Sequence, residues 1–78
     1  MATATIESRP DVLNGKPVVA GTRISVELIL DRLAAGESSS QIHQAFPHLP
    51  EGAIPAALSY AAAVMRNEMI IPMQLQPA

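Results

Sequence analysis

The stretch Gly15–Leu30, which reads GKPVVAGTRISVELIL, constrains the fold more than any other part of this 78-residue chain. A turn opens it, because Asn14-Gly15 is a strong turn dipeptide. Pro17 has no backbone N–H, so the apolar residues after it fit only an edge strand or the start of a strand. Gly21 permits a positive φ and lets the chain reverse. The stretch therefore predicts a turn, a short strand, a second turn and the start of a helix.

The helix that follows is predicted over residues 26–35. Ser25 stands where an N-cap residue is expected, and Gly36 fits the left-handed position just past a helix end. One face of the helix is apolar and contains Val26, Ile29, Leu30, Leu33 and Ala34. The opposite face carries Glu27, Asp31 and Arg32. Leu28 lies on the polar side, where we expect it to be exposed.

A second helix is predicted over about residues 39–46. Ser38 and Gln41 have the Ser-x-x-Gln spacing of a capping box. Pro47 ends the helix, because the residue before a proline avoids the helical region. The residues expected on its buried face are Ile42, Ala45 and Phe46. Leu49, in the turn that follows, is expected to fill the core between the helices.

The third helix is expected to begin near Ile54 and to extend to Met69. A start at Ile54 gives Pro55 an early position, where its missing N–H costs no hydrogen bond. One apolar stripe contains Ile54, Ala57, Leu58, Ala61 and Met65, and a second stripe on the opposite side contains Ala56, Tyr60, Ala63 and Asn67. A helix that is apolar nearly all round is buried on both sides. A body of 8.2 kDa cannot cover both sides, so the pattern predicts a protein partner.

These segments predict a single domain over residues 1–78, mainly α with a minor β element. Three helices accompany two short strands, at about residues 4–8 and 17–24. Residues 1–5 are expected to form a frayed N-terminus, 6–69 the core and 70–78 a C-terminal tail. Ile70-Ile71 fits a strand or an extended arm, which either folds back on the chain or is donated to a neighbour. Folding buries only about 60% of the surface of so small a chain. The 49% of hydrophobic residues therefore favours association, and we expect a homodimer.

The amino-acid composition of the chain excludes several classes of protein. The chain has no cysteine, which excludes a disulfide framework and a thiolate zinc site and fits a cytoplasmic protein. No apolar stretch approaches the roughly 20 residues of a membrane span, and no signal peptide is visible. The net charge of −2 gives no overall basic footprint for nucleic acid.

No residue pattern predicts catalysis. Gly15-Lys16 does not match a phosphate-binding loop, in which the lysine follows a second glycine and precedes Ser or Thr. His43 and His48 have no third ligand for a metal. The serines at 38–40 have no oriented His–acid pair to activate them, and helix capping explains them. We therefore predict a protein that is not an enzyme and holds no metal or cofactor.

Three segments carry a resemblance to a known family: GKPVVAGTRISVELIL, AAGESSSQIHQAFPHLP and ALSYAAAVMRNEMIIP. Together they resemble the DUF433 family of small bacterial proteins over roughly residues 6–73. The resemblance implies a helix-turn-helix or winged-helix-like fold. It also implies an antitoxin of a toxin–antitoxin module, which neutralises a PIN-like ribonuclease toxin and regulates its own operator DNA.

The outer stripe of the third helix and the segment after it are the predicted partner-binding site. Its residues are Ala56, Tyr60, Ala63, Arg66, Asn67, Met69, Ile70 and Ile71. The alternative is a stand-alone helix-turn-helix regulator that binds DNA. For that function Lys16 and Arg23 could contact phosphates, although solvated charges and local hydrogen bonds of Arg23 explain them equally.

The start of the third helix departs from the family pattern. In the family this segment more commonly has a capping residue, acidic residues and then a basic residue, whereas here it reads PEGAIP. Helix-turn-helix proteins read base edges from the start of their last helix, usually with Arg, Lys, Asn or Gln. Residues 50–56 contain none of these, so the usual reading surface is missing.

Overall fold

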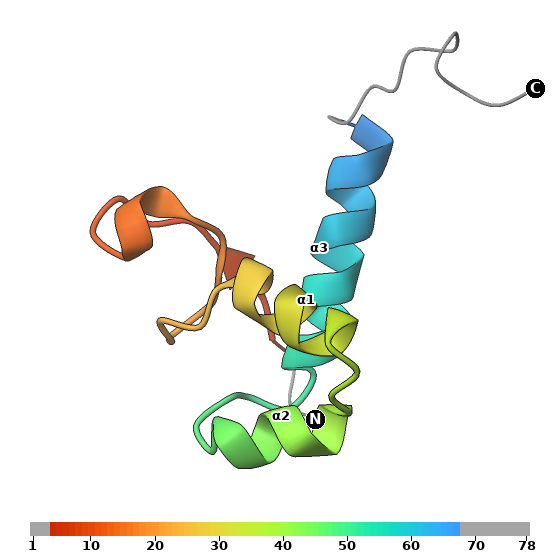
Figure 1. Cartoon of the computed structure of the whole chain (residues 1–78). Coiled ribbons are helices and arrows are strands. Elements are labelled where there is room, and N and C mark those ends of the chain that lie inside the picture. Colours follow the sequence, from red (N-terminus) through yellow and green to blue (C-terminus); the bar gives the residue numbers. More distant parts are fainter. Residues whose placement is uncertain (1–3, 68–78) are drawn as a thin grey trace, which may run out of the picture.

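The computed structural model describes residues 4–67. Three helices and a two-stranded sheet form a small, mainly helical fold of the helix-turn-helix type, which confirms the fold class predicted from the sequence (Figure 1). The elements in chain order are β1 (Ile6–Glu7), the 3-10 turn η1 (Leu13–Gly15), β2 (Val18–Val19), α1 (Val26–Ala34), α2 (Ser39–Ala45) and α3 (Ala53–Asn67). None of the helices within the described part of the chain is long and apolar enough to cross a membrane.

The strands are shorter than the predicted segments 4–8 and 17–24. β1 and β2 pair antiparallel, with Ile6 opposite Val19 and Glu7 opposite Val18. The chain after β2 folds back immediately: Val18 forms a bridge with Ser25, and the Val19 N–H donates to the Ile24 carbonyl at 2.9 Å. One edge of β2 is therefore paired with β1 and the other with residues 24–25. Each strand of the sheet is only two residues long.

A tight loop over residues 20–24 joins β2 to α1. Gly21 has a φ of +80°, as the sequence predicted for a chain reversal. The Thr22 hydroxyl donates to the Val19 carbonyl at 2.8 Å and accepts from the Ile24 N–H at 3.0 Å. Gly21 and Thr22 of the GTRI segment thus form the loop that sets the direction of α1.

Both ends of α1 are capped as the sequence predicted. The Ser25 hydroxyl accepts from the Leu28 N–H at 3.0 Å. At the other end Gly36 has a φ of +94°, and the N–H groups of Gly36 and Glu37 donate to Leu33 and Arg32, the two bonds of a Schellman motif. Two details of the prediction were wrong: Ala34 is exposed, and Leu28 is half-buried.

α2 has the predicted capping box but a smaller buried face. The Ser38 hydroxyl accepts from Gln41 N–H at 3.1 Å, and the Gln41 side chain accepts from Ser38 N–H at 2.8 Å. Ile42 is buried, whereas Ala45 is exposed, contrary to the prediction. Phe46 is only half-buried, and the Arg32 guanidinium lies 5.3 Å from the centre of its ring.

α3 begins at Ala53, one residue before the predicted start. Gly52 has a φ of +83° and its carbonyl accepts the first helical bond, from Ala56 N–H at 3.0 Å. Pro55 therefore lies in the first turn, where backbone N–H groups have no partner inside the helix. The proline that complicated the prediction is compatible with a regular helix.

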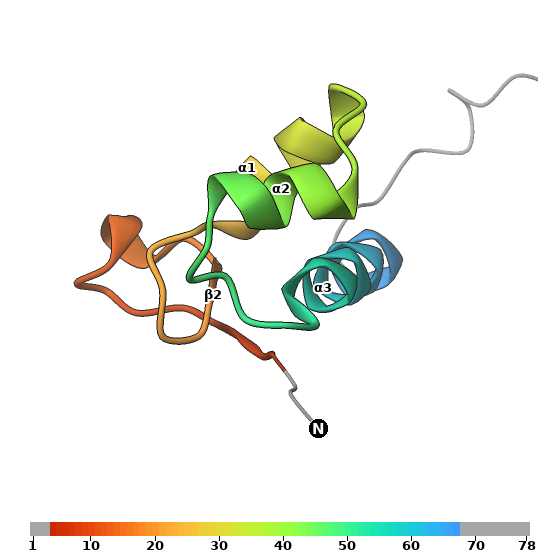
Figure 2. The same cartoon turned by 90° about the horizontal axis from the view of Figure 1, so that it is seen from below.

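The core lies where α1, α2 and the first turns of α3 meet beside β2. Figure 2 looks along α3 and shows α1 and α2 on one side of it. The buried apolar residues are Val18, Val19, Val26, Ile29, Ile42, Leu49, Ala53, Ile54 and Ala57. Leu49 fills the core from the turn between α2 and α3, as predicted. Every buried residue of α3 lies in its N-terminal half, so the core ends well before the helix does.

Candidate protein-binding groove

An apolar groove lies between α1 and the C-terminal half of α3. It has a volume of about 380 Å³ and opens to solvent. Its lining residues are Pro17, Val26, Glu27, Leu30, Asp31, Tyr60, Ala61, Val64 and Met65. α3 continues past the level at which the core ends (Figure 1), and among residues 4–67 the space between this part of α3 and α1 is left open as the groove.

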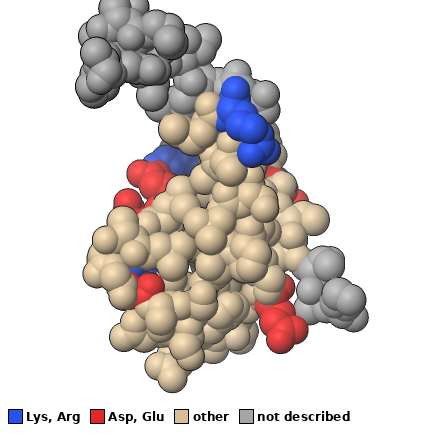
Figure 3. Space-filling view, turned by 90° about the vertical axis from the view of Figure 1, so that its right-hand side faces the viewer, with Lys and Arg blue, Asp and Glu red and all other residues tan. Residues whose placement is uncertain are grey.

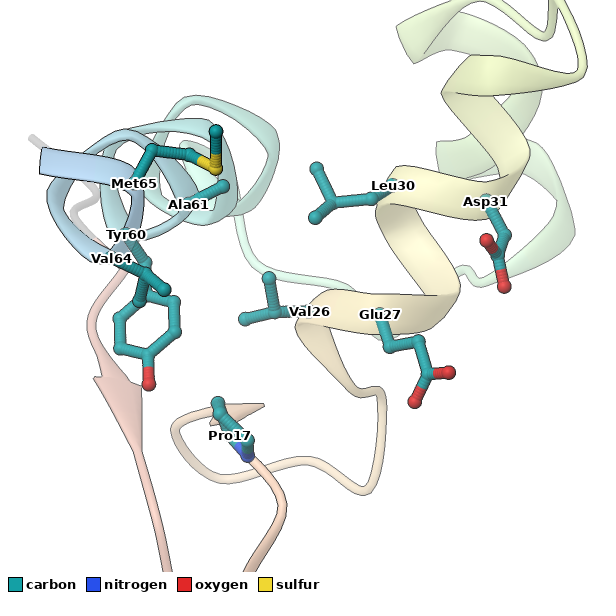
Figure 4. A pocket seen from close by; sticks show the side chains of 9 residues that line it. All are labelled: Pro17, Val26, Glu27, Leu30, Asp31, Tyr60, Ala61, Val64 and Met65. Atoms are coloured by element: carbon teal, nitrogen blue, oxygen red, sulfur yellow. The ribbon is translucent and has the colours of Figure 1, made fainter. Parts of the chain in front are cut away.

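The walls of the groove follow from the two helical periods. Val26 and Leu30 are one turn apart on α1 and point toward α3 (Figure 4). Val64 and Met65 lie opposite them on α3, with Tyr60 on the same wall (Figure 4). These side chains present carbon atoms almost exclusively, so the groove suits an apolar ligand surface.

Charge is confined to the α1 rim. Glu27 and Asp31 lie one turn apart, and their carboxylates point away from α3 (Figure 4). Glu27 Oε1 accepts from Lys16 Nζ at 3.0 Å, in an ion pair whose side chains are both largely exposed. Among residues 4–67, Asp31 has no ion-pair partner. The floor is therefore uncharged and one edge is acidic.

Large apolar side chains of α3 are exposed beyond the core. Tyr60 is 36% exposed, Leu58 48% and Met65 53%. The sequence placed Leu58 and Met65 in the same buried stripe as Ile54 and Ala57, and for these two residues that prediction was wrong. The buried residues of α3, Ala53, Ile54 and Ala57, lie in its first two turns.

The predicted partner-binding residues divide into three groups. Tyr60 lines the groove. Ala56 and Ala63 are half-buried outside it, Arg66 is exposed, and Asn67 is the last residue of α3. Met69, Ile70 and Ile71 lie outside the described residues.

Sequence reasoning missed the α1 side of the groove. Val26 and Leu30 were assigned to the core, because they share the apolar face of α1 with Ile29. Val26 is indeed buried, and Leu30 is half-buried, yet both also line the groove. The sequence did contain one signal for the groove. The apolar pattern of α3 is longer than that of the nine-residue α1, so part of α3 extends beyond α1.

The two predicted DNA-contacting residues lie apart from the start of α3. Lys16 is paired with Glu27, and Arg23 is exposed in the loop before α1. Within residues 4–67 the Arg23 side chain has no hydrogen bond or ion pair, so a local structural role for it is not observed. The first two residues of α3, Ala53 and Ile54, are buried and face the core.

The described residues contain no group of three or more His, Asp or Glu side chains that could hold a metal ion. His43 and His48 lie on either side of the end of α2, where His43 is half-buried and His48 exposed.

Comparison with known proteins gives a family. The sequence pattern of a family described as "Protein of unknown function (DUF433)" matches residues 6–61. The chain belongs to the DUF433 family. The match spans everything from β1 to the first two turns of α3, so it covers the whole core. In this DUF433 protein, the groove residues Val64 and Met65 lie beyond the matched segment.

A curated relative supports the assignment. The chain is 40% identical over 62 residues to "Uncharacterized protein y4eO" of Sinorhizobium fredii. The aligned part is 80% of this DUF433 chain but 28% of the relative, so the chain spans little more than a quarter of that protein's length. No solved structure matches the chain.

Proposed function

We propose that this DUF433 protein is the antitoxin-like component of a bacterial toxin–antitoxin module, which binds and neutralises a PIN-like ribonuclease. The observation that carries the proposal is the apolar groove between α1 and α3, with Tyr60 and Met65 exposed on its α3 wall. Exposed apolar surface of this kind, rimmed by charge, is typical of protein-binding sites.

The protein acts by occupying a surface of its partner rather than by catalysis. An apolar segment of the toxin fills the groove and covers Tyr60, Val64 and Met65. Interface energy concentrates in a few large side chains, among which tyrosine is enriched. Tyr60 is the only tyrosine of the chain, and we assign it the central contact. The antitoxin identity comes from the family resemblance, and a cytoplasmic location accords with it.

Co-expression with the protein encoded beside this chain's gene tests the function. We expect a small ribonuclease to co-purify at a fixed stoichiometry and to lose its RNase activity in the complex. Tyr60→Ala and Met65→Glu should release the ribonuclease, since both residues line the groove. Leu13→Ala is the matched control, because Leu13 is also an exposed apolar residue but lies in η1. Undiminished capture by both groove variants would contradict the proposal.

DNA binding is the second candidate, favoured by the exposed Arg23 side chain, which has no ion pair or hydrogen bond among residues 4–67. A gel-shift titration on the protein's own promoter at several salt concentrations tests it. Contacts to phosphates predict an affinity that falls steeply with salt and weakens in Arg23→Gln. No shift at low salt would exclude this role.

A further inference from the structure

The side of α3 that faces away from the groove is a second uncharged surface. Residues 52–65 contain no charged side chain. Figure 3 views the molecule from the side on which α3 lies: uncharged residues cover its centre, and charged side chains gather at the margins. The exposed residues of this outer stripe recur at helical spacing and are Pro55, Leu58, Ser59, Ala62 and Arg66.

Opposite charges bracket the outer stripe. Glu51 precedes the first turn of α3, and Arg66 lies in the last. Both are exposed, and within residues 4–67 neither has an ion-pair partner. They lie at opposite ends of α3, Glu51 two residues before its first residue and Arg66 one residue before its last. The surface therefore has an acidic end, an apolar middle and a basic end. When a second copy lies antiparallel on it, each acidic end meets a basic end.

We propose that two copies of this chain dimerise by packing their α3 outer stripes antiparallel around a twofold axis. A twofold interface uses the same patch of both copies. An axis beside Leu58 and Ser59 places Arg66 of one copy opposite Glu51 of the other, at both ends of the interface. The same operation sets Pro55 against Ala62, and Ala62 and Ser59 are small enough to let the helices approach closely.

A dimer through the outer stripe leaves the α1-facing wall of the groove free. Val64, Tyr60 and Ala61 face α1, whereas Pro55, Ser59 and Ala62 lie on the opposite side of α3. Leu58 and Met65 are seven residues apart and share the helix face between the two surfaces, so Met65 lies at the edge of both. Each copy can therefore bind another copy on one side of α3 and a partner on the other. The inference uses none of the residues tested under the proposed function, so either can fail without the other.

Sedimentation equilibrium of the full chain over a range of concentrations tests the dimer. Leu58→Asp buries two carboxylates at the axis and should weaken dimerisation at least about 100-fold. Leu58 is 48% exposed in the single copy, so this variant keeps its fold, which circular dichroism checks. Leu13→Asp introduces the same charge at an exposed leucine of η1 and should leave the dimer unchanged.

Charge reversal tests the antiparallel register. Glu51→Arg and Arg66→Glu each replace attraction by repulsion at both ends and should weaken dimerisation roughly tenfold. The double variant, Glu51→Arg with Arg66→Glu, should restore wild-type dimerisation to within about threefold. A monomeric wild-type chain at the highest concentration would overturn the proposal. A double variant as weak as the sum of the single changes would also overturn it.

Discussion

The two halves of α3 differ in what surrounds them. The N-terminal half has one face, formed by Ala53, Ile54 and Ala57, that is under 5% exposed and packs against α1 and β1 in the core that also holds Val19 and Ile42. The C-terminal half continues the apolar pattern as far as Met65, yet Tyr60 is 36% and Met65 53% exposed. Since residues 53–65 carry no charge, the difference in burial comes from what packs on each half. The first half holds the fold together, and the second half offers a surface.

Truncating one side chain in each half of α3 tests this difference most strongly. Ile54→Ala removes a side chain that is 4% exposed and should lower the free energy of unfolding by about 2–5 kcal/mol. Val64→Ala, in the half-buried groove wall, should cost about 1 kcal/mol or less. Urea unfolding followed by circular dichroism gives both values. Equal losses would show that the groove wall is as much a part of the core as Ile54.

The entry into α3 gives a second, smaller effect. Gly52 has a φ of +83°, a conformation that costs a residue with a Cβ about 1–2 kcal/mol. Gly52→Ala should therefore destabilise the fold by that amount and affect the groove only indirectly. Thermal unfolding measures it, with Ala62→Gly as a mid-helix comparison of about 1 kcal/mol. A neutral Gly52→Ala would mean that the helix starts differently.

Truncating groove side chains should lower the free energy of unfolding less than truncating a buried core residue such as Ile54. Met65→Ala truncates a residue that is 53% exposed and should alter the free energy of unfolding by about 0.5 kcal/mol, whereas Tyr60 is 36% exposed and its truncation to Ala should cost about 1–2 kcal/mol. The same urea titration tests them. Losses above about 2 kcal/mol would place these side chains in the core and remove the contrast between the halves.

The ion pair at the groove rim should contribute least. Lys16 and Glu27 are 59% and 65% exposed, so their 3.0 Å contact should be worth about 0.2–1 kcal/mol. Lys16→Met should lower stability by no more than that, and salt should diminish the difference between the two proteins. Unfolding in low and high salt checks both statements.

Local signals in the sequence predicted the fold well. Ser25, Ser38 and Gly36 set helix ends through hydrogen bonds with near neighbours, and such bonds can be inferred from spacing alone. The bounds of α1 and α2 and the start of α3 were therefore predicted to within one residue, whereas the predicted end of the third helix at Met69 lies outside the described residues. Ala34 and Ala45 were assigned to the core and are exposed, because helical spacing gives a face but not how far the neighbouring element extends along it.

The candidate site was harder to predict for the same reason. Periodicity identified a surplus of apolar surface on α3 and selected Tyr60, which lines the groove. It could not reveal that Val26 and Leu30 form the opposite wall, since residues on two helices come together only through tertiary packing. The GTRI segment illustrates the converse: Gly21 and Thr22 form a loop through local bonds that can be inferred from the sequence, whereas Arg23 has no hydrogen bond or ion pair among residues 4–67.

The central claim is that the open half of α3 binds a partner protein. Calorimetric titration of the proposed partner, the protein encoded beside this chain's gene, with wild-type chain, Tyr60→Ala and Leu13→Ala tests it most directly. The account predicts that Tyr60→Ala weakens binding about 30-fold or more, whereas Leu13→Ala leaves the affinity unchanged. Equal affinities of all three proteins would contradict it.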